Sequence, residues 1–221
     1  MKQIYTFLFG QGNLSPDAIV NIFSWKAEAG PAQLRLPDSC LWEGAAAAWG
    51  ATRLSCRLDR TLAEQIAHSV RQAAGNVTLI GDPEKYASLG LPVIADAVKG
   101  RGPMGGIYTA LLHSKEDWNL VVACDMPGLA PDFLRALIQA ATQAAGLSPQ
   151  SCLVCEGPGG IEPLCAVYHR RLLPALESAL EYKQLKMKDF VLQQNPGRWP
   201  VADASALRNV NTPEEWRQEV A

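Results

Sequence analysis

The chain has 221 residues, 48% of them hydrophobic, and a formal net charge of −2. This length and composition predict one globular domain with a sizeable core, and the near-neutral charge argues against nucleic-acid binding. No apolar run approaches the roughly 20 residues of a membrane span, and the opening segment lacks the cleavage site of a signal peptide, so we expect a cytoplasmic protein that acts on small molecules.

The first sixty residues are atypical. Residues 3–9, QIYTFLF, are the only early segment with the β-branched and aromatic character of a strand. Residues 41–58, LWEGAAAAWGATRLSCRL, show neither a helical stripe nor a strand alternation. We therefore separate an atypical segment, residues 1–60, from a domain over residues 61–221, and we expect residues 30–58 to be irregular.

Strands and helices alternate from Thr61 onward. In residues 61–75, Leu62, Ile66 and Val70 lie at helical spacing. Gly75 provides a stop for this helix. Further along, we predict strands over residues 76–80, 91–94 and 119–124, and helices that begin near residues 106 and 131. This alternation predicts an α/β fold with a mostly parallel sheet and helices on both faces.

Three candidate ligand-binding residues, Gly81, Asp96 and Asp125, follow predicted strands. Ligands of such sheets bind at the carboxyl ends of the strands, where all three residues fall. Asp125 ends an apolar strand, and a carboxylate there suits Mg²⁺, which prefers one or two protein carboxylates together with phosphate oxygens. The alternative is an aspartate that caps the next turn.

A glycine-rich loop, DAVKGRGPMGG, covers residues 96–106 and contains Gly102. Glycines allow the backbone to approach a ligand closely, and the helix that follows presents N–H groups to anions or polar bases. A plain turn would explain the same composition. The interpretation of this loop as a ligand-binding loop is strengthened because Asp125 follows the next strand.

Cys152 and Cys155 form a CxxC pair. No second CxxC and no histidine pair completes a zinc site, so we predict a buried, reduced strand in which both cysteines act as small apolar side chains. The three histidines, which lie far apart in the sequence, are interpreted as structural or surface groups.

Three blocks carry a resemblance to a known family. LPVIADAVKGRGPMGGIYTAL, LVVACDMPGL and NVNTPEEW resemble the molybdenum cofactor guanylyltransferases, and PLCAVYHRRLLPALE and KMKDFV lie between them in the expected order. The resemblance covers about residues 61–216. It implies a three-layer, Rossmann-like nucleotidyltransferase domain that attaches GMP from GTP to molybdopterin with Mg²⁺.

The resemblance also implies roles for individual residues. Asp125 corresponds to the magnesium-binding aspartate, and Asp96 corresponds to a residue that contacts the guanine nucleotide. Gly81 and Gly102 fall on the same nucleotide side of the site. Asn209 and Asn211 would lie toward the pterin substrate. Transient contact with molybdoenzymes or other proteins of the cofactor pathway is a further expectation.

One family feature is absent from the chain. Family members open with a strand and a phosphate loop of the form LAGGxSxRMGxDKA, in which backbone N–H groups and a lysine bind the phosphates. FLFGQGN, residues 7–13, offers a strand and a GxG but lacks the later Gly, Arg and Lys. We therefore regard it as a poor substitute for the loop.

The codons that can encode residues 42–54 are compatible with this loop in a shifted reading frame. When the last nucleotide of each codon is joined to the first two of the next, these residues permit G-G-x-S-x-R-M-G-x-D-K-A. Two glycines are forced, at the junctions of Trp42 with Glu43 and of Trp49 with Gly50. We therefore expect residues from about 30 to 60 to be an out-of-frame translation of the loop and earlier residues to be leader sequence. The alternative is a diverged or unrelated N-terminus.

Two other functions remain open. Cytidylyl- and sugar-nucleotidyl-transferases resemble this fold, but they tend to carry LAAG in place of LAGG, and the forced glycine codon cannot encode that alanine. Guanylyl transfer is therefore favoured. The other possibility is a non-catalytic protein that binds a nucleotide or pterin without transferring anything, because the phosphate loop is missing.

Overall fold

The structure is a computed structural model that describes residues 4–9, 20–23, 51–75, 77–144, 150–210 and 215, and only the backbone of residues 4–9, 20–23 and 51–61. Its described strands form one sheet of eight strands in the order β4-β3-β2-β1-β5-β7-β6-β8. The strands are β1 (Ile4–Phe9), β2 (Val20–Phe23), β3 (Thr78–Ile80), β4 (Val93–Ile94), β5 (Trp118–Ala123), β6 (Cys152–Gly157), β7 (Gly160–His169) and β8 (Gly197–Pro200).

The described sheet is mixed: six of its eight strands run in one direction, but four of the seven neighbouring pairs are antiparallel. Strands β2 and β7 run opposite to the other six, because each pairs antiparallel with both of its neighbours. The remaining pairs, β1 with β5, β3 with β4 and β6 with β8, are parallel. The carboxyl ends of β1, β3, β4 and β5 therefore meet at one edge of the sheet.

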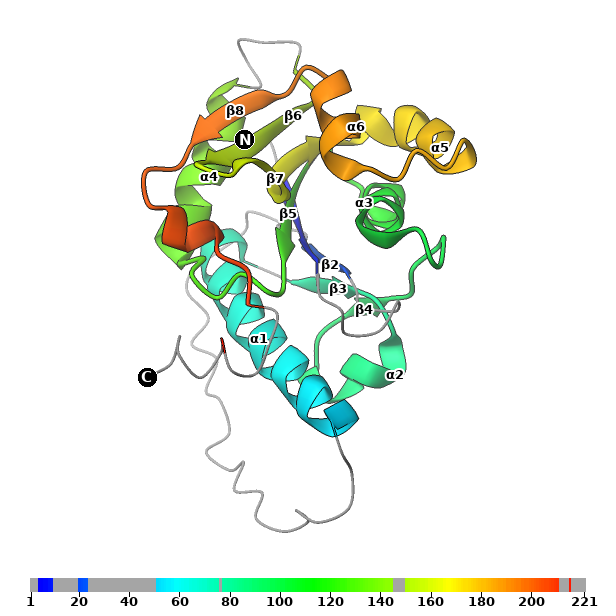
Figure 1. Ribbon diagram of the computed structural model, residues 1–221, viewed down its shortest axis with the longest axis vertical. Helices are drawn as coiled ribbons and strands as arrows, with labels where there is room; N and C mark the ends of the chain where they lie inside the picture. Colours follow the sequence, from blue (N-terminus) through cyan, green and yellow to red (C-terminus); the bar gives the residue numbers. More distant parts are fainter. Residues whose placement is uncertain are drawn as a thin grey trace.

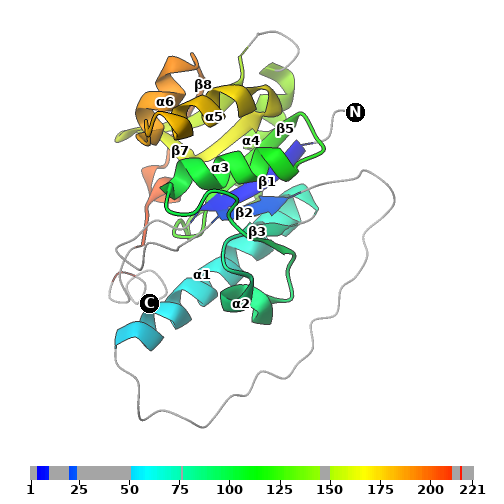
Figure 2. The ribbon, with the colours of Figure 1, turned by 90° about the vertical axis from the view of Figure 1, so that its right-hand side faces the viewer.

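Helices cover both faces, which confirms the three-layer arrangement. Helices α1 and α4 lie on one face, and α3 and α5 lie on the other (Figures 1 and 2). The described helices are α1 (Ala51–Ala74), α2 (Pro83–Tyr86), α3 (Gly102–His113), α4 (Pro131–Ala144), α5 (Leu173–Glu181) and α6 (Met187–Gln193), with short 3-10 helices η1 (Ala87–Leu89), η2 (Arg170–Leu172) and η3 (Ala204–Leu207). Among these, none is both long and apolar enough to cross a membrane.

Strand β1 lies near the middle of the sheet. The prediction of a strand in residues 3–9 is confirmed, since Ile4–Phe9 pairs in parallel with β5 from Ile4↔Trp118 to Phe9↔Ala123. The strand that follows was not predicted. Strand β2 lies between β1 and β3 and is antiparallel to both, so β1 and β3 are not neighbours.

Helix α1 begins at Ala51, ten residues before the predicted start at Thr61. The expectation that residues 51–58 are irregular is therefore wrong, while residues 30–50 lie outside the described part of the chain. The reason is visible in the sequence: Leu54 and Leu58 continue, at four-residue spacing, the apolar row of the C-terminal half of the helix. Helix α1 ends just before Gly75, as predicted. Gly75 has φ +94° and donates its N–H to Arg71 O at 2.9 Å.

Two further helix starts can be compared with the sequence. Helix α4 begins at Pro131, as predicted. Helix α3 begins at Gly102 and not near Gly106, because Pro103 occupies its first turn, where a missing N–H costs nothing.

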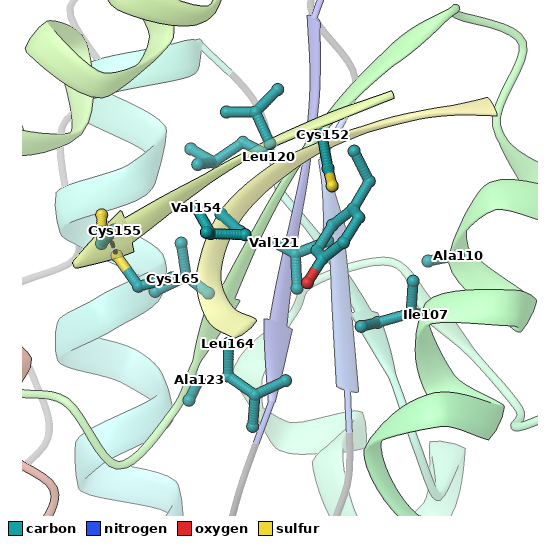
Figure 3. Packing of buried hydrophobic residues seen from close by; sticks show 14 of the residues in the cluster. Ile107, Ala110, Leu120, Val121, Ala123, Cys152, Val154, Cys155, Leu164 and Cys165 are labelled. Carbon is teal, nitrogen blue, oxygen red and sulfur yellow. Dashed lines mark hydrogen bonds between the residues drawn. The ribbon is translucent and has the colours of Figure 1, made fainter. Parts of the chain in front are cut away.

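The core lies on both faces of β5, β6 and β7, and Figure 3 shows the part that includes the cysteines. Cys152 and Cys155 are 1% and 0% exposed, so the prediction of a buried strand is confirmed. Cys155 contacts Cys165 rather than Cys152, with 3.5 Å between the two Sγ atoms. Burial raises the pKa of Cys152 to about 12, which keeps this thiol protonated and unreactive.

Candidate active site

Three of the candidate residues lie where the strands predict them. Gly81, Asp96 and Asp125 follow β3, β4 and β5 at the carboxyl edge of the sheet. Strands β3, β2 and β1 separate β4 from β5, so at a spacing of about 4.8 Å the two aspartates are roughly 19 Å apart across the sheet. A ligand that reaches both must be elongated, as a nucleoside triphosphate is.

Asp125 is 4% exposed and lies two residues beyond the end of β5. Its carbonyl oxygen accepts a hydrogen bond from Val210 N–H at 2.7 Å. Asn209, the residue before Val210, is half-buried, so the structure brings this predicted substrate residue close to Asp125. Asn211 lies outside the described residues.

Strand β7 bends beside Asp125. Its pairing with β5 ends at Val122↔Cys165, while its pairing with β6 shifts register between Val154 and Cys155 and continues at Cys155↔Glu162. The tip of the β6–β7 hairpin therefore leaves β5 at the level where β5 itself ends. Val210 N–H bonds to Asp125 O two residues beyond the end of β5.

Glu162 lies at this bend in β7. Its Oε1 accepts a hydrogen bond from Leu164 N–H at 3.1 Å. Burial raises the pKa of Glu162, and the Leu164 hydrogen bond and the positive charge of Lys188 partly offset that rise. No sequence pattern predicts this half-buried carboxyl, because its burial depends on the bend and on α6 packing over β7.

Asp96 organises the glycine-rich loop. Its Oδ1 accepts hydrogen bonds from Val98 N–H at 3.0 Å and from Thr109 Oγ1 at 2.9 Å. The Thr109 hydroxyl, which is fully buried, also accepts from Ala97 N–H at 3.0 Å and lies 2.8 Å from Gly105 O. Since the hydroxyl has one proton, the Asp96 and Gly105 oxygens share it. Both hydrogen bonds to Asp96 use Oδ1, and Oδ2 is the oxygen to which a ligand could bind.

Thr109 is a site residue that the sequence reading missed. The available signal was a hydroxyl on an apolar helix, four residues after Gly105, a spacing that lets it bond back to the preceding turn. Gly105 itself is required for close approach, because a Cβ there would lie 2.8 Å from Val98 O.

The other two glycines differ in what they offer a ligand. Gly81 is buried, and its N–H donates to Ile94 O at 2.8 Å, so this donor belongs to the sheet and not to a phosphate. Gly102 is exposed, has φ +57° and begins α3, where Arg101 provides no side-chain cap. Of the first residues of α3, exposed Gly102 carries an N–H that could bind a polar ligand, whereas Pro103 has none and Met104 and Gly105 are buried.

The donor set at Asp125 fits magnesium. A buried carboxylate at the end of a strand is one oxygen ligand, and Mg²⁺ takes its other ligands from phosphates and water. In the described part of the chain there is no group of three His, Cys, Asp or Glu residues that could hold a metal.

The N-terminal candidate gains no support from the geometry. Of FLFGQGN, residues 7–9 belong to β1, and residues 10–13 lie outside the described residues. The strand part of the motif is thus present at the centre of the sheet. Its GxG part stays a prediction.

Comparison with known proteins identifies related sequences. The sequence profile of the family described as MobA-like NTP transferase domain matches residues 53–197. A probable molybdenum cofactor guanylyltransferase of Flavobacterium johnsoniae is 34% identical over 58% of the chain and 65% of its own length, just under two thirds. A molybdenum cofactor guanylyltransferase of Vibrio parahaemolyticus is 31% identical over 61% of the chain and 67% of its own length.

A solved structure shows the same architecture. Molybdopterin-guanine dinucleotide biosynthesis protein A of Archaeoglobus fulgidus superimposes with a TM-score of 0.52 and 26% identity, over 62% of this chain and 72% of that one. The residues that match the family, 53–197, contain β3 to β7 and therefore both aspartates of the candidate site.

Proposed function

Because the chain belongs to the family of MobA-like NTP transferase domains, we propose that it transfers GMP from GTP to molybdopterin and releases pyrophosphate. The names of the Flavobacterium, Vibrio and Archaeoglobus relatives support this activity. The observation that carries the proposal is the contact between Asp125 and the segment of Asn209, because it joins a metal-type carboxylate to a second group of polar side chains at one edge of the sheet.

The chemistry needs positioning more than it needs reactive side chains. An oxygen of the terminal phosphate of molybdopterin attacks the α-phosphorus of GTP. The new P–O bond forms as the bond from the α-phosphorus to the bridging oxygen breaks, and pyrophosphate leaves with that electron pair. Rate enhancement then comes from holding the two phosphates in line and from offsetting their charge.

Each candidate residue has a role in this scheme. Asp125 would hold Mg²⁺, which supplies positive charge against the phosphate oxygens of GTP. Asp96 and the N–H group of Gly102 would bind the guanine nucleotide, while Gly81 leaves space at the end of β3. Asn209 and Asn211 would contact molybdopterin. Transient contact with the molybdoenzymes that receive the product belongs to the same proposal.

A pyrophosphate-release assay tests the proposal. With molybdopterin and Mg²⁺ present, we expect at least about tenfold higher kcat/KM for GTP than for CTP, a difference of about 1.4 kcal/mol that one base-specific contact can provide. Mass spectrometry should identify the product as the guanine dinucleotide of molybdopterin. Equal rates with GTP and CTP would contradict guanine recognition. Binding without any release of pyrophosphate would support the non-catalytic alternative.

A further inference from the structure

The segment of residues 203–210 touches three separate parts of the molecule. Val210, 2% exposed, packs against Leu62 of α1 and donates its N–H to Asp125 O. Near η3, the backbone of this segment lies close to Gly128. A Cβ added to Gly128 would be 2.8 Å from Ser205 O. Leu207 approaches the β6–β7 hairpin, where its Cδ1 would lie 3.2 Å from a Cβ on Gly157.

The start of this segment is also fixed. Asp203 accepts a hydrogen bond from Ser205 N–H at 2.9 Å and so caps η3. The bonds from Ser205 lower the pKa of the exposed Asp203 carboxyl, so the cap is charged near neutral pH. The start of the segment therefore has a defined local conformation, and its end is joined to Asp125 and Leu62.

We infer that residues 203–210 form a positioning segment that couples the acceptor side of the site to the carboxylate of Asp125. The inference rests on the proposed function, in which Asn209 faces the acceptor and Asp125 holds the metal. The Val210 N–H that follows Asn209 bonds to Asp125 itself, so a shift of Asn209 on acceptor binding is transmitted to Asp125 through one hydrogen bond. Such coupling is reciprocal: the acceptor should tighten metal binding by the factor by which the metal tightens acceptor binding.

Gly128→Ala separates the segment from Asp125 without removing a polar group. Its Cβ would lie 2.8 Å from Ser205 O and 3.1 Å from Ala206 Cα, both backbone atoms, so the segment must shift. Gly159→Ala is the matched control. A Cβ on Gly159, at the tip of the β6–β7 hairpin, has no neighbour within 4 Å.

The experiment measures binding, so it does not depend on turnover. Free Mn²⁺ is counted by electron paramagnetic resonance in the presence of the α,β-methylene analogue of GTP, with and without molybdopterin. In the wild type and in Gly159→Ala, molybdopterin should lower the Kd of Mn²⁺ at least about fivefold. In Gly128→Ala this change should fall below twofold, while the midpoint of thermal unfolding confirms that the variant is folded.

Two results would overturn the inference: no effect of molybdopterin on Mn²⁺ binding in the wild type, or full coupling in Gly128→Ala. If Gly128→Ala fails to fold, Val210→Ala is used in its place. This variant removes the side-chain contact with Leu62 and keeps the backbone N–H of residue 210. Coupling should be reduced in Val210→Ala and restored in Val210→Ile. Failure of the proposed function is recognised separately, because the wild type would then form no guanine dinucleotide from GTP and molybdopterin.

Discussion

Asp125 uses its backbone and its side chain for different tasks. The carbonyl oxygen joins β5 to the segment of residues 203–210, and the carboxylate is the group that the proposed function assigns to Mg²⁺. A substitution that changes only the carboxylate should therefore alter chemistry without disturbing that junction. This separation makes Asp125 the residue at which the metal role can be tested most directly.

Asp125→Asn should keep the fold and lower the rate of GMP transfer at saturating Mg²⁺ by about 100-fold or more, because an amide oxygen replaces a charged ligand. Pyrophosphate release measures the rate, and thermal unfolding checks the fold. Asp132→Asn is the control, since the Asp132 side chain is 92% exposed in a surface ion pair on α4. Near-normal turnover of Asp125→Asn would disprove the metal assignment.

Thr109 should affect nucleotide binding through Asp96. In Thr109→Val, Asp96 Oδ1 and Ala97 N–H each lose a partner, so the loop that carries Asp96 loosens. We expect KM for GTP to rise severalfold with little change in kcat, and the free energy of unfolding to fall by about 1–3 kcal/mol.

Thr142→Val is the control for Thr109, because the Thr142 hydroxyl bonds to Ile138 O in an exposed turn of α4. It should change neither KM nor stability appreciably. An unchanged KM in Thr109→Val would mean that the loop does not bind the nucleotide through Asp96.

Among the elements, α5 ends in a conformation that its sequence does not favour. Lys183 has φ +56°, Gln184 N–H bonds to Ala179 O at 2.8 Å and Lys183 N–H bonds to Leu180 O at 3.3 Å, which together form a Schellman motif. The left-handed position is usually glycine. Helix α6 ends similarly at Asn195, with φ +50°, but asparagine tolerates that region better than lysine.

Lys183→Gly should raise the free energy of unfolding by about 0.5–1 kcal/mol, because the strain relieved, about 1–2 kcal/mol, exceeds the extra chain entropy of glycine. Urea denaturation measures this change. Asn195→Gly should give a smaller gain. A loss of stability in Lys183→Gly would mean that the lysine side chain makes a contact worth more than the strain.

Buried Cys152 in strand β6 should make the free energy of unfolding depend on pH in the alkaline range. The thiol of Cys152 ionises above about pH 9 in the unfolded chain, but in the folded protein its pKa is raised to about 12 by burial. The unfolded state therefore loses its proton first, and the free energy of unfolding should fall between pH 9 and 12. Cys152 contributes up to about 1.4 kcal/mol per pH unit.

Denaturation of the wild type and of Cys152→Ala at several pH values tests this dependence. The cavity left by alanine lowers stability equally at every pH, so the slope above pH 9 is the diagnostic quantity. It should be shallower in Cys152→Ala. Equal slopes would mean that Cys152 does not ionise on unfolding in this range.

The elements that the sequence predicts are those whose apolar pattern is local. Strand β5 and helix α4 follow from buried runs and from Pro131, and Gly75 ends α1 as expected. The early start of α1 was also in the sequence, in Leu54 and Leu58, but the neighbouring alanine run obscured it. Strand β2 could not be predicted, because four residues become a strand only when two partners flank them.

At the scale of the whole molecule, the site is assembled from residues far apart in the sequence. Asp96 and Asp125 can be predicted from the sequence because strand ends in a parallel sheet share an edge, whereas Asn209 is a candidate only through the family resemblance. The bond from Val210 to Asp125, the approach of Gly128 to Ser205 and the bend in β7 depend on tertiary packing. No periodicity or motif encodes them.

The chain as printed should bind GTP weakly, because it lacks the lysine and the run of backbone donors of the family's phosphate loop. A version in which the hypothetical single-nucleotide shift across residues 30–60 is reversed should bind GTP at least about tenfold more tightly, since charge-assisted phosphate contacts are the strong ones. Calorimetry measures both affinities. Equally tight binding by the printed chain would show that its N-terminus is a genuine sequence.

The bend in β7 divides the sheet into parts that can open independently. Residues 166–168 of β7 pair with a strand on each side, whereas residues 160–162 pair only with β6. Opening of the hairpin tip would separate Ile161 from the core and part of β6 from β8 but leave β7 paired with β5, so it should require less free energy than global unfolding. Because Leu207 lies against this tip, opening of the tip would remove one of the contacts that hold residues 203–210 in place.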